Sequence, residues 1–408
     1  MTKSRWAWGL LALVPFLAGC SGFWDAPNSS SSTTTTTTTL TSGYFFVLDQ
    51  DTSKIISYNV AAGVLTEAGT IAVPATPIAM TVAPNNAFLY VSTLNGIYLY
   101  TISGGTLTLG NSSSLIINDP AVAMVVDSTD SWLIETSGDS PYTLNAIPIV
   151  STTGIVNASA AVCSGSTSVV CTAKLPGTAG TSGAIVVNQM AIAPNNQFIF
   201  LADDTNGTEI YTFTAAVTSS APNPFGATLA TLIPANYGGS TLGAAHSAAV
   251  DPTSRLLYVG ESVATSSGGG LRAFTFAYDS VKGFTLTEIS GSPYPSGSSG
   301  PYAILPKATG DFVYVANWNG TSAGNITTFS ISDTSKGVYS LTALSTSATT
   351  GIKPVALAED SNAEFVLAEC GGGSPYLDIY FFDSTTPSTL DLTLTSSAFA
   401  GITVAAAR

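Results

Sequence analysis

One short pattern recurs along the chain and constrains its fold more than any other feature. Each copy reads as an apolar strand, a tight turn built on Pro-Asn-Asn or an equivalent, and a second apolar strand. The clear copies are Ile78–Ser92, Asn188–Ala202 and His246–Gly260, and the looser ones are Val122–Thr136, Tyr302–Ala316 and Pro354–Ala368. A supersecondary unit repeated at a period of tens of residues indicates a repeat architecture.

Further strand signals complete each repeat. After Leu89–Ser92, the segment Gly96–Ile102 alternates in period two, and a Gly-Gly turn leads into Thr106–Leu109. The later repeats continue in the same way. Four strands per unit, joined by turn residues, are typical of a β-propeller blade.

The two ends of the chain supply one more blade. Gly401–Ala407 matches a first strand that has no second strand after it. Tyr44–Leu48 matches a second strand, and Ile55–Val60 and Val64–Ile71 follow it as a third and fourth. Pairing these pieces leaves no open sheet edge. The sequence therefore predicts an all-β fold, a seven-bladed β-propeller over residues 44–408, closed by pairing of the N-terminal strands with the C-terminal strand.

Residues 1–19 are predicted to be a signal peptide. Lys3 and Arg5 precede an apolar run that is too short to span a bilayer comfortably. This run ends in Leu17-Ala18-Gly19-Cys20, which resembles the lipobox of bacterial lipoprotein signal peptides. The resemblance implies cleavage before Cys20 and acylation of that residue. The alternative is a plain secretory signal with a chance cysteine.

Residues 20–43 are predicted to be a Ser/Thr-rich tether. The stretch Thr33–Thr39 is unbroken threonine, and the whole segment has too little apolar surface to pack. A glycosylated stalk is the alternative. Several acyl chains on Cys20 would give durable anchoring, so a membrane is the expected partner there. Because Ser21 rather than Asp follows Cys20, the resemblance implies the outer membrane, facing the periplasm or the cell surface.

The charge balance limits the partners. Only 9% of the residues are charged; cleavage of the signal peptide would leave nine Lys and Arg against 25 Asp and Glu, a formal charge of −16. Nucleic acid requires clustered basic groups, so it is not expected as a partner. The same argument disfavours a strongly anionic substrate. We expect a monomer whose partner is an envelope protein or a carbohydrate.

Two cysteines are candidates for a disulfide. Cys163 and Cys171 enclose a short loop, and an oxidising compartment would let them pair. Two buried thiols are the alternative. Both lie in the longest insertion between repeats, 137–187, which is either a loop on a binding face or drift in loop length. Cys370 ends an apolar strand and is expected to be buried.

The starts of the first strands are candidate ligand sites, because these strands line the central channel of a propeller. The position six residues before the turn proline, or its equivalent, is occupied in successive repeats by Ile78, Val122, Asn188, His246, Tyr302 and Pro354. His246 is the only histidine, so any imidazole acid–base step must use it. A structural histidine is the alternative. The predicted ligand-binding residues are Asn188, Gln189, Ser247, Tyr302 and Trp318. Trp318 is expected in a loop, as a contact for a sugar or a partner.

The repeats are similar to those of a known family. The Ala-Pro-Asn-Asn turns, Phe312–Asn317 and Leu256–Val259 resemble the lactonase-type seven-bladed propellers and the surface YVTN propellers, over about residues 44–408. That family includes 6-phosphogluconolactonases, muconate-lactonising enzymes and envelope proteins. In the lactonising members a channel-mouth His works with Glu and Arg, so the resemblance implies a catalytic role for His246. Glu261 and Arg272 lie in the same repeat but do not align with the mouth.

A phosphorylated substrate is not expected. Phosphate binding favours Arg, and the predicted propeller contains only Arg255, Arg272 and Arg408. Asp203–Glu209 carries oxygen ligands around a glycine, but Ala202 occupies the first ligand position of a calcium loop, so an acidic turn is the simpler interpretation. No zinc, nucleotide or serine-hydrolase motif occurs, and the sequence predicts no metal and no cofactor.

Two functions remain. The first is a non-catalytic binding or scaffold protein of the cell envelope. The alternative is a lactonase-like hydrolase or isomerase that acts on a neutral lactone or sugar derivative at the central channel. Carboxylates or Arg close to His246 would favour the enzyme, and a mouth of aliphatic and Ser/Thr groups would favour the binding protein.

Overall fold

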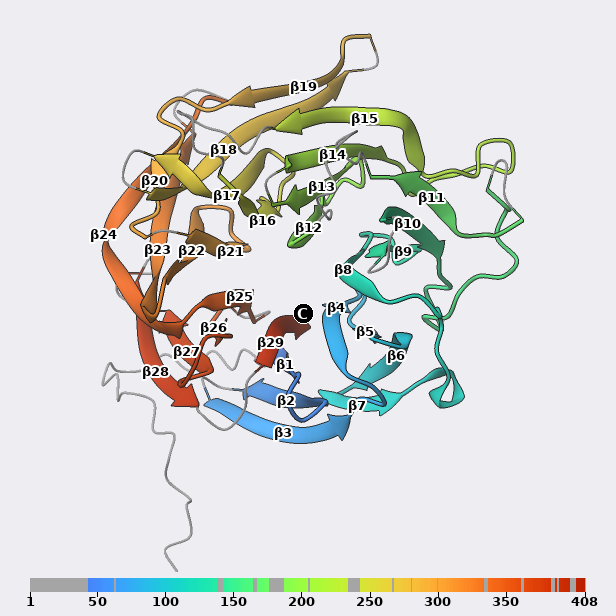
Figure 1. The fold of residues 1–408 in the computed structure, drawn as a ribbon, viewed down its shortest axis with the longest axis horizontal. Helices are drawn as coiled ribbons and strands as arrows, with labels where there is room; N and C mark the ends of the chain where they lie inside the picture. Colours follow the sequence, from blue (N-terminus) through green and yellow to red (C-terminus); the bar gives the residue numbers. More distant parts are fainter. Residues whose placement is uncertain are drawn as a thin grey trace, which may run out of the picture.

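The structure is a computed structural model that describes residues 43–407, except 62–63, 138–141, 164–166, 176–186, 205, 234–242, 266–267, 280, 299, 334–336, 361–362, 383–385, 387–388 and 397–400. The predicted signal peptide, Cys20 and the tether up to residue 42 lie outside the described residues. Seven antiparallel sheets surround a central channel, which confirms the predicted seven-bladed β-propeller (Figure 1).

Each blade is built on four strands, which lie side by side in order from the channel to the rim (Figure 1). The first blade contains β29 (Gly401–Ala407), β1 (Gly43–Asp49), β2 (Lys54–Ala61) and β3 (Val64–Ala72). The second contains β4 (Pro77–Val82), β5 (Phe88–Thr93), β6 (Gly96–Ser103) and β7 (Thr106–Leu109). The third contains β8 (Ala121–Val126), β9 (Trp132–Ser137), β10 (Thr143–Pro148) and β11 (Cys171–Lys174). The fourth contains β12 (Gln189–Ile192), β13 (Phe198–Asp203), β14 (Gly207–Phe213) and β15 (Phe225–Ile233).

The remaining blades follow the same order. The fifth contains β16 (Ala245–Val250), β17 (Leu256–Thr265), β18 (Gly268–Asp279) and β19 (Gly283–Glu288), with β20 (Tyr294–Pro295) paired to β18. The sixth contains β21 (Gly300–Pro306), β22 (Phe312–Asn319), β23 (Ser322–Asp333) and β24 (Tyr339–Ile352). The seventh contains β25 (Pro354–Glu359), β26 (Phe365–Cys370), β27 (Leu377–Phe382) and β28 (Leu390–Ser396). A 3-10 turn, Asn111–Ser113, connects β7 and β8. Within the described residues, no helix has the length and apolar character needed to cross a membrane.

The chain ends close the ring as predicted. β29 pairs antiparallel with β1, from Tyr44 opposite Ala407 to Leu48 opposite Thr403. In Figure 1 the C-terminal strand lies at the centre, beside the channel. Since β29 is the innermost strand of a blade whose other three strands come from the N-terminus, the first blade is complete only when both ends are in place.

Strand alternation explains how the blades pack. All six residues of β5 are buried, although the strand is short. Leu89 and Val91 pack with Phe46 of the first blade, whereas Phe88 and Tyr90 face the third blade. Successive side chains of a strand point to opposite faces, so each second strand contributes to two interfaces. The aromatic residues Tyr90 and Phe200 of the second strands pack between neighbouring blades in this way.

The turns between first and second strands also connect neighbouring blades. Asn196 adopts a left-handed conformation with φ of 55°, which Asn tolerates better than most residues. Its Nδ2 donates to the Asp127 carboxylate of the third blade at 3.2 Å. Asp127, which is fully buried, also accepts a hydrogen bond from the Trp132 backbone N–H at 2.6 Å. These side chains therefore close hairpins and hold blades together at the end of the ring opposite the strand starts.

Cys163 and Cys171 are joined by a disulfide in the structure, and their Cα atoms lie 5.4 Å apart. Cys171 begins β11 and pairs with Ala146, so the disulfide fastens the insertion to the outermost strand of the third blade. Cys370 is a buried free thiol.

Removing this disulfide is expected to destabilise the protein. Closing a loop of this length contributes about 2–3 kcal/mol by the chain-entropy estimate. The double variant Cys163→Ser/Cys171→Ser should therefore melt several degrees below the wild type under oxidising conditions. The wild type in reductant should melt with the variant; equal melting temperatures for the oxidised wild type and the variant would contradict the prediction.

Candidate ligand site at the channel mouth

A repeated bulge aims one residue of most first strands into the mouth of the channel. In β16, Ala245 pairs with Glu261 and Ser247 pairs with Gly260, so His246 is the extra residue. Tyr302 occupies the same position in β21. A bulge re-aims a side chain and is common near sites of function. The other bulged first-strand residues with described side chains are Ile78, Val122 and Val355.

Pro354 was predicted at this position, and that register is wrong by one residue. Pro354 pairs with Cys370 and Ala356 pairs with Glu369, so Val355 is the bulged residue. Proline fixes φ and cannot donate a ladder hydrogen bond, which suits it to the first position of the strand. Val355 therefore adds an aliphatic group to the mouth.

Three aromatic side chains gather at the mouth. The rings of His246 and Tyr302 stack with centroids 4.2 Å apart and an interplanar angle of 14°. Trp318 meets Tyr302 edge to face, with centroids 5.4 Å apart. Each of the three is half-buried, so part of each ring remains accessible. We call His246, Tyr302 and Trp318 the mouth cluster.

Trp318 was expected in a loop, but it lies near the end of β22. Its indole N–H donates to the Gly320 carbonyl, and its own carbonyl accepts from Ser298 Oγ at 2.8 Å. The indole is therefore held by its own strand and by the following turn, which gives the mouth cluster a defined wall.

Lys353 and Asp204 place charge beside the mouth cluster. The Lys353 ammonium lies 5.8 Å from the Tyr302 ring centroid and 5.6 Å from that of Trp318, within range of cation–π attraction. The Asp204 carbonyl accepts the backbone N–H of Ala245, which sets Asp204 next to His246. Both charges lie in segments that connect strands, outside the first-strand positions that the repeat pattern marks.

Burial dominates the electrostatics of His246. It lowers the pKa of the imidazole below its ordinary value; the nearby Asp204 opposes this shift and Lys353 reinforces it. The imidazole is therefore neutral at pH 7 and can donate with one nitrogen and accept with the other. Burial also raises the pKa of the Tyr302 hydroxyl, with a further contribution from Asp204, so this group stays protonated.

Below the mouth cluster the first strands enclose a cavity of 410 Å³. Its walls are the aliphatic residues of β4, β8, β21 and β25, together with Asn188, Gln189 and Tyr302. Asn188 Nδ2 donates to the Ala245 carbonyl at 3.0 Å, and Gln189 Oε1 accepts the Ala248 N–H at 3.1 Å. These two predicted residues do line the channel, and each also ties the fourth blade to the fifth.

Ser247 lies elsewhere. It is fully buried, and its hydroxyl donates to the Pro301 carbonyl at 2.9 Å. The bulge at His246 turns the following side chain away from the channel, toward the sixth blade. Ser247 is therefore an inter-blade contact and not a wall of the mouth.

Glu261 and Arg272 form a buried ion pair within the fifth blade. Arg272 donates to Glu261 Oε1 at 3.0 Å and to Glu288 Oε2 at 2.9 Å. The guanidinium is committed to these carboxylates, consistent with the expectation that the pair does not serve the mouth. Across the described part of the chain, no three His, Cys, Asp or Glu side chains are grouped closely enough to hold a metal ion.

Comparison with known proteins identifies a structural class. No protein-family model matches the sequence, and no protein of curated function matches it. Solved structures match over nearly the whole chain. A protein from Bacteroides fragilis, provisionally assigned as a 6-phosphogluconolactonase, has a TM-score of 0.68 at 13% identity, covering 91% of this chain and 99% of its own.

Two other solved structures are similar. A protein from Bacteroides uniformis with the same provisional assignment has a TM-score of 0.65 at 14% identity, covering 90% of this chain and 99% of its own. A protein of unknown function from Desulfotomaculum acetoxidans has a TM-score of 0.59 at 10% identity, covering 90% and 99%. At these identities the likeness defines the fold: a seven-bladed β-propeller with lactonase-like structural neighbours.

Proposed function

We propose that this protein is an exported, lipid-anchored binding protein of the cell envelope that holds a carbohydrate at the channel mouth without transforming it. The mouth cluster carries the proposal. A stacked His–Tyr pair with a Trp edge offers apolar ring faces, and Lys353 and Asp204 beside it offer polar contacts. Sites that combine aromatic faces with a few placed polar groups are typical of small-ligand pockets.

The surroundings of His246 favour binding over catalysis. Among the described residues, no carboxylate and no Arg hydrogen-bonds to the imidazole. Arg272 and Glu261 are occupied by each other, and the bulged residues elsewhere around the mouth are aliphatic. A lactonase needs a base for water and a donor for the developing oxyanion. His246 could serve as the base, because its lowered pKa leaves it neutral, but a group that orients it is missing from the described residues.

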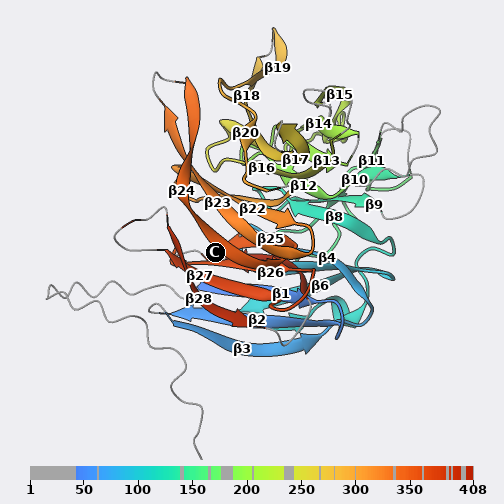
Figure 2. The same ribbon diagram turned by 60° about the vertical axis from the view of Figure 1, so that its left-hand side comes forward.

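The test is a ligand screen on full-length protein purified in detergent. Thermal shift and titration calorimetry against neutral sugars, uronic acids and aldonolactones would be run for the wild type, His246→Ala and Trp318→Ala. A stacking contact contributes about 1 kcal/mol, so each variant should bind about 5-fold more weakly. Val281 lies in the exposed hairpin between β18 and β19, which projects from the ring (Figure 2); Val281→Ala is the control and should bind as the wild type does.

The same samples separate the two functions. For a binding protein, glucono-δ-lactone should open at its spontaneous rate with either wild type or His246→Ala. Turnover by the wild type that is lost in His246→Ala would support the hydrolase instead. If no sugar or lactone shifts the wild type, or if all variants shift alike, the mouth is not a carbohydrate site.

A further inference from the structure

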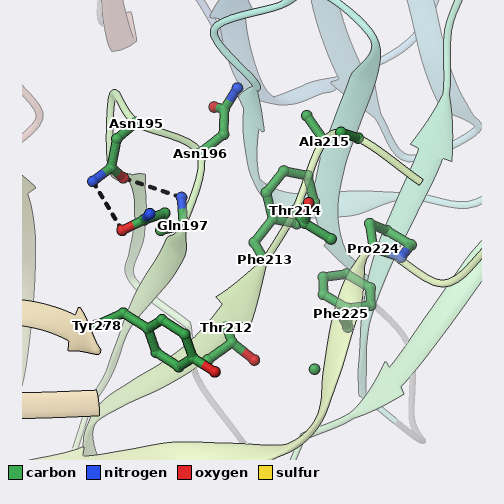
Figure 3. Close-up of a pocket in the computed structure, with 12 residues that line it drawn as sticks. Asn195, Asn196, Gln197, Thr212, Phe213, Thr214, Ala215, Pro224, Phe225 and Tyr278 are labelled. Carbon is green, nitrogen blue, oxygen red and sulfur yellow. Dashed lines mark hydrogen bonds between the residues drawn. The ribbon is translucent and has the colours of Figure 1, made fainter. Parts of the chain in front are cut away.

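A second pocket lies at the opposite end of the propeller. Residues of the fourth blade and Tyr278 of the fifth line it (Figure 3). β12 starts at the channel mouth, so the turn Asn195–Gln197 that follows it lies at the far end. The pocket has a volume of 580 Å³. Its other walls are the end of β14 with the residues that follow it, the start of β15, and Tyr278 of β18.

An irregularity in the fourth blade opens this pocket. Tyr211 pairs with Leu229 while Phe213 pairs with Phe225, so β15 contains two more residues than β14 over the same stretch. Gly226 lies within this irregular stretch. A Cβ at that position would overlap the Thr212 hydroxyl, at 1.7 Å, so glycine keeps the two strands close while the stretch bends away.

Aromatic rings form the floor and one wall. Phe213 and Phe225 are buried, with centroids 6.2 Å apart. Tyr278 reaches in from the fifth blade and extends toward Thr212 (Figure 3). Tyr278 is 54% exposed, although its ring centroid lies 6.4 Å from that of Phe198. A large aromatic face is therefore accessible and held in place at the edge of the pocket.

The polar rim is neutral and partly preorganised. Asn195 Nδ2 donates to Gln197 Oε1 at 3.2 Å, and the Gln197 N–H donates to Asn195 Oδ1 at 3.1 Å (Figure 3). This pair positions the Gln197 amide through its oxygen and leaves Nε2 out of both hydrogen bonds. Within the described chain, Gln197 Nε2 and the hydroxyls of Thr212, Thr214 and Tyr278 bond to no protein atom.

We propose that this pocket is a second binding site, and that its ligand is a neutral saccharide. A pyranose ring has apolar C–H faces, which match the rings of Tyr278 and Phe225, and a rim of hydroxyls, which match the amide and hydroxyl groups. None of the described residues lining the pocket is charged, so an anionic ligand would have no counter-charge there. A purely apolar ligand would leave the polar rim without partners. The site is independent of the mouth cluster.

The experiment isolates this pocket by disabling the mouth. Full-length His246→Ala/Trp318→Ala protein in detergent would be titrated calorimetrically with glucose, galactose, N-acetylglucosamine, cellobiose and chitobiose. We expect at least one of them to bind. Adding Tyr278→Ala, which removes a stacking face, or Gln197→Ala, which removes an amide donor, should weaken that binding about 5-fold.

Val281→Ala is the matched control. Val281 belongs to the same hairpin as Tyr278 and is 91% exposed, but it does not line the pocket, so its removal should leave the affinity unchanged. Unchanged melting temperatures would show that all variants fold. The proposal is overturned if none of the five sugars binds the mouth-disabled protein. It is also overturned if the bound sugar retains its affinity in both Tyr278→Ala and Gln197→Ala.

Discussion

Deleting residues 401–408 is expected to prevent the chain from forming a stable monomer. β29 supplies six paired positions to β1. An antiparallel ladder averages about one hydrogen bond for each position, and at about 1 kcal/mol net for each bond the loss removes roughly 5 kcal/mol. A typical domain is stable by only about 5–15 kcal/mol, so little stability would remain. The deletion also leaves β1 as an open edge facing the channel, and an open edge can pair with another chain.

The deletion also weakens the ring at the channel. β29 contacts β25 and β26 on one side and β4 on the other, so its loss removes the innermost contacts of the first blade with the seventh and second blades. We expect aggregates or a broad early transition in size-exclusion chromatography and thermal unfolding. A truncated chain that elutes as a monomer and melts within a few degrees of the wild type would contradict this account.

A circular permutant is the control. Ala407 lies opposite Tyr44, so a short linker can join residue 407 to residue 43 as a hairpin, with new termini in the exposed turn at Ser112–Ser113. Every blade then stays on one continuous segment. This permutant should fold with nearly the stability of the wild type. Failure of both proteins would mean that the position of the ends matters, and not the strand alone.

The sequence predicts the propeller because its fold depends on local, repeated chemistry. The continuous apolar run Phe88–Val91 must bury both faces of its strand, and a strand between two neighbouring blades does so. The turn residues Asn86 and Asn196 sit where a left-handed conformation is required. The two incomplete ends then predict how the ring closes. The C-terminal end supplies a first strand and the N-terminal end supplies a second, third and fourth, so pairing them completes one blade.

The mouth was predictable in part. The positions of His246 and Tyr302 can be predicted by counting back from the turn. The bulges cannot be predicted in this way, because an extra residue leaves the apolar pattern intact. That is why Pro354 was placed where Val355 lies, and why Ser247 was assigned to the channel. Lys353 and Asp204 come from connections between strands, and the pocket at Tyr278 depends on two blades and on the irregular pairing of β15. Such contacts between distant segments have no local signal.

Glu369 is a buried carboxyl group at a position where other blades have small residues. In the corresponding register the second strands carry Ser92, Gly260 and Ala316. Glu369 is fully buried, and neither carboxyl oxygen has a hydrogen-bond partner among the residues that the structure describes. Burial raises its pKa well above the ordinary value, and the neighbouring Asp49 raises it further. The folded protein therefore retains the proton on Glu369 to a higher pH than the unfolded chain does.

This shift sets the direction of the pH dependence. An unfolded Glu ionises near pH 4.5, whereas the folded protein retains the proton to a higher pH. Its contribution to stability is complete below the ordinary pKa and is lost as the pH rises toward the raised pKa, at up to about 1.4 kcal/mol per pH unit. Burial likewise raises the pKa of Glu135 and of Glu209 to about 8. The wild type should therefore melt at a lower temperature at pH 8 than at pH 5.

Replacing Glu369 with Gln should remove its share of this dependence, because the amide keeps the shape of the neutral acid and cannot ionise. We expect Glu369→Gln to raise the unfolding free energy at pH 8 and to change it little at pH 4.5. The measurement is thermal unfolding of both proteins across that range. Glu67→Gln is the matched control, because Glu67 is exposed and the same change there should have no effect at either pH. An equal gain at both pH values would mean that Gln improves packing and that Glu369 does not titrate between them, because only a group that is neutral when folded and charged when unfolded gives a gain confined to high pH.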